Sequence, residues 1–372
     1  MLSIISIGSV LNNCSSQNKE VVKIGAVLPL TGPYALLGES EQKGLRLATE
    51  ILNSSDSIYA DKIDLALEDS KGQTNDAVAG AQKLMSAQRI NYIITSLSGV
   101  SLAIKPIVLN NQGLQIAYAM DEKISQDAAT VFRIYPSIIE EGQTILKYLK
   151  SKTSGRVAIV YFNSEVFERE VREVLEPGLK ESMVQGIDIE NFDDVSATRN
   201  IFAKLRQKKP NIIIINCYYT QYQSIFKILN EYDLLGSEIV GGLDLSIAIN
   251  QDLLQDSWLD SVIVAAPLSN FITNDNTNNK PREYFLKKYE EKYNEPPIYE
   301  AAYAYDSLML LVQAMNTSNS NDPAEVAKAL RNIKNFQGAT GNISILEDGN
   351  VKSSWVLGKI KEGDLIPIDE NK

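Results

Sequence analysis

The feature that most constrains the fold is a regular alternation of short apolar runs with stretches in which apolar residues recur at helical spacing. Residues 22–30 form an apolar run closed by Gly32 and Pro33, which is typical of a buried parallel strand. Residues 39–51 then carry apolar side chains near helical spacing. The same alternation predicts further strands at 63–67, 92–94 and 114–118 and helices at 74–88 and 99–110. This order predicts one doubly wound α/β lobe.

The alternation starts again after a predicted helix at 138–150. The strands expected in this half are 157–162, 187–192, 212–217 and 239–241, and the helices are 168–182, 199–207 and 221–232. A chain of 372 residues is long enough for two domains of about 150 residues each. The sequence therefore predicts an α/β protein with two doubly wound, Rossmann-like lobes.

Composition excludes several classes of function. The chain has 36 Lys and Arg against 47 Asp and Glu, and its net charge of −11 has the wrong sign for binding nucleic acid. It contains no His, which excludes Ser-His-Asp and Cys-His catalysis and histidine-ligated metals. Its two Cys are too few for a cysteine-held metal cluster, and neither GxGxxG nor GxxxxGK[ST] occurs. We therefore expect no enzyme activity, no cofactor, no metal site and no nucleic-acid partner.

Residues 1–20 resemble an export signal followed by a polar tether. Residues 2–11 form an apolar stretch too short to span a membrane but long enough for a signal-peptide core. The residues up to Cys14 resemble a bacterial lipobox, with Leu11 in place and Asn13 as a departure from the usual small residue. This predicts an extracytoplasmic protein of the bacterial cell envelope, held at the membrane only through a lipid on Cys14. The alternative is that 2–11 is a buried strand and Cys14 an ordinary small apolar residue.

Three motifs carry a resemblance to a known family. The first motif, in residues 24–53, is LPLTGP followed by Gly38 and then by Gly44 before an amphipathic helix. The second is the segment 289–308, which leads into a helix that contains Ala-Tyr-Asp. The third, in residues 216–219, places two tyrosines at a predicted strand end. From about residue 21 to about residue 360, the chain resembles the leucine/isoleucine/valine-binding protein family, the type I solute receptors of ATP-driven importers. The resemblance implies two lobes joined by a hinge of three crossovers. It implies a first lobe of 21–137 plus 269–344 and a second of 138–268 plus 345–372.

The resemblance also implies where a solute carboxylate would bind. The family uses a strand-end Ser and a later Thr, and in this chain Gly99 stands at the Ser position between Ser98 and Ser101. The backbone N–H groups and hydroxyls there could bind an anion at a helix start, although Ser98 could equally be a plain N-cap. The Thr position falls near Met120 or Asp121, in the segment that begins at Tyr118. A negative Asp121 would repel a carboxylate.

For the ammonium group of a solute, the family uses tyrosines and an acidic residue of the second lobe. Tyr218 matches one of these tyrosines, and its ring could close over the ligand. Asp244 approximates the acidic position. Val166 and Phe167 replace the Tyr-Gly pair that is usual after the first strand of that lobe, so one polar contact becomes apolar.

One aromatic ring of the first lobe is also replaced. Leu37 stands where an aromatic residue is common, and Tyr34 or Tyr299 could supply the missing ring. These changes, with the loss of the Ser/Thr pair, indicate a solute that is less polar than a standard α-amino acid or differently charged. The candidate ligand-binding residues are Tyr34, Leu37, Ser98, Gly99, Ser101, Tyr118, Asp121, Val166, Tyr218, Asp244 and Tyr299.

The sequence therefore predicts a receptor that captures a small amino acid, or a related amide or organic acid, between two closing lobes. Its partners would be this solute and the membrane permease subunits of an ABC importer. The alternative is a sensory module of the same fold, which binds a ligand and signals to a partner protein.

Overall fold

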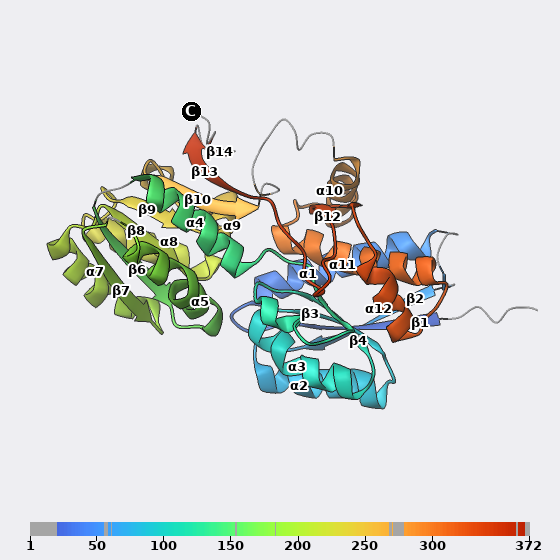
Figure 1. The fold of residues 1–372 in the computed structure, drawn as a ribbon. Coiled ribbons are helices and arrows are strands. Elements are labelled where there is room, and N and C mark those ends of the chain that lie inside the picture. Colours follow the sequence, from blue (N-terminus) through green and yellow to red (C-terminus); the bar gives the residue numbers. More distant parts are fainter. Residues whose placement is uncertain are drawn as a thin grey trace, which may run out of the picture.

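A computed structural model places the chain in two lobes that lie side by side (Figure 1). The structure describes residues 21–55, 59–60, 62–152, 155–182, 184–267, 270, 279–361 and 364–368. The predicted signal segment 1–20, with the lipidation candidate Cys14, lies outside these residues. Among the described residues, no helix is both long and apolar enough to cross a bilayer.

The first lobe is built on a parallel sheet in the order β2-β1-β3-β4-β5. Its strands are β1 (Val21–Leu28), β2 (Lys62–Asp69), β3 (Tyr92–Ser96), β4 (Leu114–Tyr118) and β5 (Val131–Arg133). Its helices are α1 (Ala35–Asn53), α2 (Thr74–Gln82), α3 (Ser98–Asn110), α10 (Lys280–Tyr293), α11 (Tyr299–Ser318) and α12 (Pro323–Arg331). Short turns η1 (Lys83–Ala87) and η2 (Glu122–Ile124) and the hairpin β11 (Phe336–Gly338) and β12 (Gly341–Ile343) complete it.

The second lobe is built on a sheet in the order β14-β13-β10-β9-β8-β6-β7, in which β13 runs antiparallel to both of its neighbours and all other pairs are parallel. Its strands are β6 (Arg156–Phe162), β7 (Gly186–Phe192), β8 (Ile212–Asn216), β9 (Glu238–Gly241), β10 (Val262–Pro267), β13 (Trp355–Lys361) and β14 (Asp364–Pro367). Its helices are α4 (Ile138–Lys152), α5 (Glu165–Glu170), α6 (Glu176–Lys180), α7 (Thr198–Lys208), α8 (Tyr219–Glu231) and α9 (Leu243–Asn250), with turns η3 (Val171–Leu175), η4 (Val195–Ala197) and η5 (Asp256–Trp258).

In the part of the chain that the structure describes, the path passes from one lobe to the other at three places. These lie between β5 and α4, between β10 and α10, and between β12 and β13 (Figure 1). The predicted fold class, two doubly wound α/β lobes, is confirmed. The residue boundaries expected for the lobes stay a prediction.

Alternating side chains of each central strand pack against helices on opposite faces. In β1, Ile24, Ala26 and Leu28 share a core with α1 and α11, whereas Val27 faces α2 and α3. In β6, Val157, Ile159 and Tyr161 face α4 and α5, whereas Ala158 and Val160 face α7 and α8. This is why the strands read as continuous apolar runs rather than as an alternating pattern.

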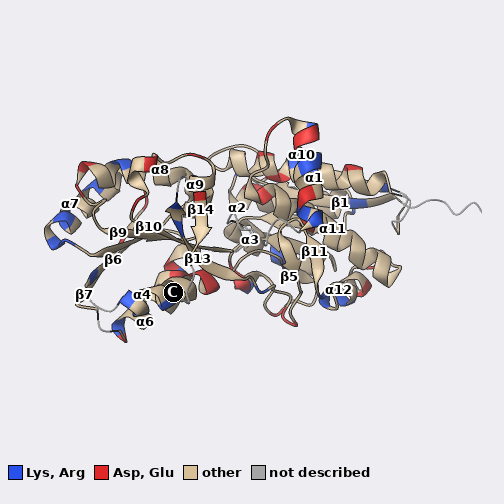
Figure 2. Cartoon of the chain, turned by 90° about the horizontal axis from the view of Figure 1, so that it is seen from above, with Lys and Arg blue, Asp and Glu red and all other residues tan. Residues whose placement is uncertain are grey.

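Helix α1 begins at Ala35, earlier than the predicted start at 39. Gly38 therefore lies inside the helix, where a Cβ atom would approach the backbone nitrogen of Leu30 to 2.9 Å. The glycine thus permits close packing of the helix against the segment that follows β1. The outer helices carry many charged side chains: α7 has only Lys and Arg, whereas α10 has charges of both signs (Figure 2).

Candidate functional site

A cavity of about 230 Å³ lies between the two lobes. Its lining residues follow the carboxyl ends of β1, β3 and β4 in the first lobe and of β6, β8 and β9 in the second. In open parallel sheets, ligands bind beyond the carboxyl ends of the strands. One water molecule requires about 10–15 Å³ on the same measure, so this cavity has room for a small solute.

Most of the predicted site residues come together in this cavity. They are Tyr34, Leu37, Ser98, Gly99, Tyr118, Asp121, Val166, Tyr218 and Asp244. The structure does not place Ser101 or Tyr299 there. The hydroxyl of Ser101 is fully buried and donates to Thr95 Oγ1 at 2.9 Å, and the hydroxyl of Tyr299 is bonded to that of Tyr303 at 2.8 Å.

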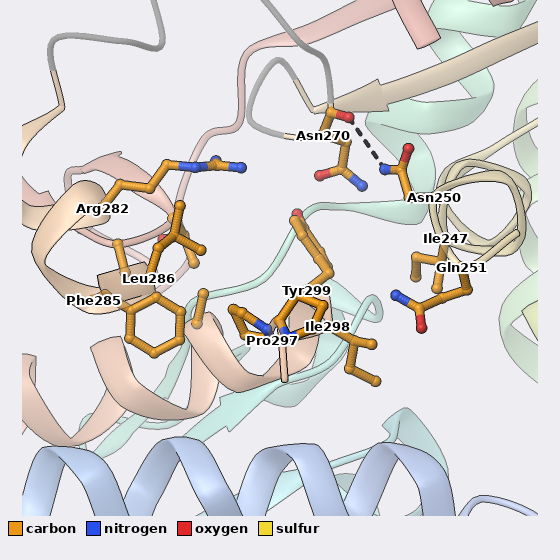
Figure 3. Close-up of a pocket in the computed structure, with 14 residues that line it drawn as sticks. Ile247, Asn250, Gln251, Asn270, Arg282, Phe285, Leu286, Pro297, Ile298 and Tyr299 are labelled. Carbon is orange, nitrogen blue, oxygen red and sulfur yellow. Dashed lines mark hydrogen bonds between the residues drawn. The ribbon is translucent and has the colours of Figure 1, made fainter. Parts of the chain in front are cut away.

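Tyr299 instead lines a second cavity, of about 200 Å³, shown in Figure 3. This cavity lies among α9, α10 and the start of α11, and Asn250 Nδ2 donates to the carbonyl of Asn270 at its edge, at 3.3 Å. Arg282 also lines it. This cavity does not lie at the carboxyl ends of the parallel strands, so we place the candidate site in the first cavity.

The aromatic wall of the site joins the two lobes. The ring of Tyr218, at the start of α8, lies edge-on to Tyr34 of the first lobe, with the ring centroids 5.2 Å apart. Phe167 contacts Tyr218 from its own lobe, also at 5.2 Å. The apolar Val166 also lines the cavity. Tyr218 therefore forms part of the wall that closes the cavity.

The start of α3 forms the end of the cavity at which a carboxylate was expected. Leu97 is the residue before the helix and has a φ of 63°, a left-handed conformation that is strained for a leucine. The N-cap alternative for Ser98 is therefore wrong: Ser98 is the first helical residue, and its hydroxyl accepts from the N–H of Asp121 at 3.3 Å. At Gly99, a Cβ atom would meet only Thr74 Cγ2, at 4.0 Å, so there is open space where a side chain of residue 99 would stand.

Asp121 does not carry the unpaired charge that the sequence suggested. Its Oδ1 lies 2.6 Å from Nη1 of Arg169, which comes from α5 of the other lobe. The same guanidinium group lies 3.0 Å from Glu122. The repulsion expected between Asp121 and a carboxylate is therefore largely offset, and the ion pair links the two lobes.

Sequence reasoning missed three carboxyl groups of the cavity, those of Glu41 in α1, Glu165 in α5 and Glu300 in α11. Glu41 Oε2 accepts a hydrogen bond from the hydroxyl of Ser96 at 3.0 Å. Glu300 is only 4% exposed, and its Oε2 has no hydrogen-bond partner. Tyr135, in the segment between β5 and α4, also lines the cavity and was missed.

The site carboxyls are strongly perturbed. Burial raises the pKa of Glu41 to about 8, and repulsion from Glu300 adds to this shift. Burial likewise raises the pKa of Glu300 to about 8, with repulsion from Asp244 adding to it. Burial raises the pKa of Asp244 to about 7, against a hydrogen bond from the N–H of Tyr219 that lowers it. Burial in the folded chain therefore disfavours the ionised form of all three groups.

These shifts predict how stability depends on pH. Each of these carboxyl groups holds its proton more tightly in the folded chain than in the unfolded chain. Its contribution to the free energy of unfolding is therefore complete below the pKa of the unfolded chain, about 4. The contribution is lost as the pH rises through the folded pKa values of about 7 to 8. Glu141 and Glu170, buried in the second lobe, act in the same direction because burial also raises their pKa values. We expect the Tm of the solute-free protein to fall by several degrees, about 5 °C or more, between about pH 6 and about pH 9.

Scanning calorimetry across this range measures the effect. The Glu300→Gln variant removes one of the titrating groups and should show a smaller fall than the parent protein. A Tm that is constant or rises over this interval would contradict the assignment of these groups as protonated in the folded state.

Among the residues that the structure describes, no group of three or more Cys, Asp or Glu side chains is arranged to hold a metal ion. The site thus consists of an aromatic wall, an acidic cluster and a helix start, contributed by two lobes. Such an arrangement has the chemistry of a binding site for a small solute.

Comparison with known proteins gives the family. Residues 21–364 match the family model described as periplasmic binding protein, and the chain belongs to this family. Membership implies a place outside the cytoplasm. Leu/Ile/Val-binding protein homolog 1 of Brucella abortus (strain 2308) is 24% identical over 353 residues, which cover 92% of this chain and 91% of the relative.

Two solved structures show the same fold. The branched-chain amino acid transporter substrate binding protein of Streptococcus pneumoniae, solved with isoleucine, has a TM-score of 0.78 at 22% identity, covering 93% of this chain and 98% of that one. A solute binding protein of an ABC transporter from Rhodopseudomonas palustris BisB5, solved with 3,4-dihydroxybenzoic acid, has a TM-score of 0.81 at 18% identity, covering 94% and 96%. Both neighbours are named as substrate or solute binding proteins of transporters.

Proposed function

We propose that the protein is the extracytoplasmic receptor of an ABC importer. It captures a small amino acid, or a related amide or organic acid, in the cavity between its lobes and presents the closed form to the membrane permease subunits. Lipidation of Cys14 would keep the receptor at the membrane surface. The relatives from Brucella, Streptococcus and Rhodopseudomonas support this proposal by their names and bound solutes.

The observation that carries the proposal is the composition of the cavity from both lobes. Tyr34 and Tyr118 come from the first lobe, and Tyr218 and Asp244 come from the second. A solute that contacts both sets of residues stabilises the closed arrangement in which they meet. The ion pair between Arg169 and Asp121 adds a direct link between the lobes in this arrangement.

A thermal-shift screen of the purified protein tests the proposal. The panel contains branched and aromatic amino acids, their amides, short organic and aromatic acids, and simple amines. A solute at about 100 times its Kd adds roughly 2.7 kcal/mol to stability, so a true ligand gives a clear rise in Tm. If no compound of the panel shifts the Tm at millimolar concentration, the proposal is contradicted.

The open position at Gly99 gives a further prediction. In Gly99→Ser, the new hydroxyl would stand beside the start of α3 without a clash, because the nearest atom to its Cβ is 4.0 Å away. A hydrogen bond to a charged group contributes about 1.5–3 kcal/mol, so the affinity for solutes with a carboxylate should rise about tenfold. Titration calorimetry with leucine and with leucinamide measures this. An equal change in affinity for leucine and for leucinamide would argue against binding of the solute carboxylate beside Gly99.

A further inference from the structure

Apart from tyrosines, the ionisable side chains that line the cavity are all carboxyl groups. Among the described residues that line it, five have carboxyl side chains and none is Lys or Arg. Two of the five carboxyl groups have a cation nearby. Asp121 is paired with Arg169. The side chain of Glu165 is 72% exposed and lies 3.9 Å from Lys123 Nζ. The remaining three, Glu41, Glu300 and Asp244, have no cationic partner in the described structure.

These three carboxyls lie close enough to affect one another electrostatically. Repulsion from Glu300 acts on Glu41, and repulsion from Asp244 acts on Glu300. Glu41 and Glu300 belong to α1 and α11 of the first lobe, and Asp244 belongs to α9 of the second. The acidic cluster therefore spans the cleft, and a positive charge placed in it would draw the two lobes together.

Two buried polar atoms of the cavity also lack a hydrogen-bond partner. One is Oε2 of Glu300, and the other is the hydroxyl of Tyr118, a residue that is 3% exposed. Leaving a buried polar group unpaired costs about 1–3 kcal/mol, and more when the group is charged. Both atoms belong to residues that line the cavity, where a ligand that donates hydrogen bonds could pair with them.

The nearby arginines do not supply the missing charge. Arg169 is held by Asp121, Glu122 and Glu173. Arg133 is buried at the end of β5 and donates to Asn350 Oδ1 at 2.6 Å and to backbone carbonyl groups, including that of Ala119 at 3.2 Å. Neither arginine lines the cavity.

We propose that the solute is a small organic cation, an amine whose positive charge is not balanced by a carboxylate, with its ammonium group bound among Glu41, Glu300 and Asp244. This inference rests on the proposed role as a solute receptor with this same site, and it assigns to the site an amine in place of the amino acid, amide or organic acid named there. The ammonium group supplies the absent counter-charge and the hydrogen-bond donors. The rings of Tyr34, Tyr118, Tyr135 and Tyr218 provide faces and apolar contacts suited to an organic cation.

Titration calorimetry with a matched series of compounds tests the inference. Isopentylamine, leucine, isocaproamide and isocaproate share one branched apolar body and are respectively a cation, a zwitterion, a neutral amide and an anion. Putrescine is added as a dication. We expect isopentylamine or putrescine to bind at least about tenfold more tightly than the other three compounds.

The outcomes separate the two proposals. If leucine, isocaproamide or isocaproate binds as tightly as the amines, the inference is overturned and the proposed function stands. If no compound binds up to millimolar concentration, the proposed function is contradicted, and the inference falls with it.

Three variants locate the charge that matters. Glu300→Gln and Glu41→Gln should each weaken amine binding by about tenfold or more, because each removes a carboxylate from the cation site. Both variants should fold, since each replaces a buried carboxyl that lacks a cationic partner by a neutral amide of similar shape. Glu39→Gln is the matched control, because Glu39 lies on the exposed side of α1 with a side chain that is 61% exposed. Equal amine affinity in all three variants would overturn the inference.

Discussion

Replacing Tyr218 with Ala is expected to lower solute affinity by about 30-fold or more. The ring of Tyr218 contacts Tyr34 across the cleft and Phe162 and Phe167 within its own lobe. Its removal opens the wall of the cavity and deletes an aromatic contact between the lobes. Central buried aromatic residues of this kind carry a large share of binding energy, typically 2 kcal/mol or more on truncation.

The Tyr218→Phe variant separates the ring from its hydroxyl. It keeps the aromatic contacts and should retain affinity to within about tenfold, which is the scale of one lost hydrogen bond. Tyr284→Ala is the control for loss of a tyrosine elsewhere, since Tyr284 is 46% exposed on α10 and does not line the cavity. Titration calorimetry with a solute identified by the thermal-shift screen measures all three. Undiminished affinity in Tyr218→Ala would show that the solute binds somewhere else.

Replacing Gly44 with Ala is expected to destabilise the protein by about 3 kcal/mol. Gly44 lies where α1 crosses α11. A Cβ atom at this position would overlap the carbonyl group of Ala301, because it would lie only 2.9 Å from the carbonyl carbon. A backbone group cannot swing aside as a flexible side chain can, so the two helices would have to separate. The contact between α1 and α11 is the core of the first lobe, and both helices carry a carboxyl of the site.

Urea unfolding of the solute-free protein measures this loss. Gly236→Ala is the matched control, because a Cβ atom at Gly236 would meet nothing within 4 Å. This control should change stability by less than about 0.5 kcal/mol. Equal stability of the two variants would mean that α1 and α11 do not pack as closely as described.

Much of the architecture was predictable because buried parallel strands and amphipathic helices leave different spacings in the sequence. The strand ends could be located in this way, and Tyr218 and Asp244 lie two and three residues after the ends of β8 and β9. Where prediction failed, the orientation of a residue on its helix was the reason. Tyr299 and Glu300 are neighbours on α11, and a rotation of about 100° between them sends one into the second cavity and the other into the site.

The same geometry explains Ser101. It lies two positions after Gly99 on α3, so its side chain points to the sheet and bonds Thr95 instead of facing the cavity. Glu41 had a signal in the sequence that was not used: it shares the apolar stripe of α1 with Leu37, Leu45 and Ala48. A carboxyl on such a stripe is either paired or functional. The pairing of Asp121 with Arg169 joins residues 48 positions apart in two lobes, and no local pattern predicts it.

The central claim is that one solute is bound by both lobes at once. Hydrogen–deuterium exchange of the protein, with and without a saturating solute from the screen, tests it most directly. We expect slower exchange in the peptides around Glu41 and Tyr118 of the first lobe and, together with these, around Tyr218 and Asp244 of the second. Slower exchange in only one lobe, or only at sites away from these residues, would contradict it.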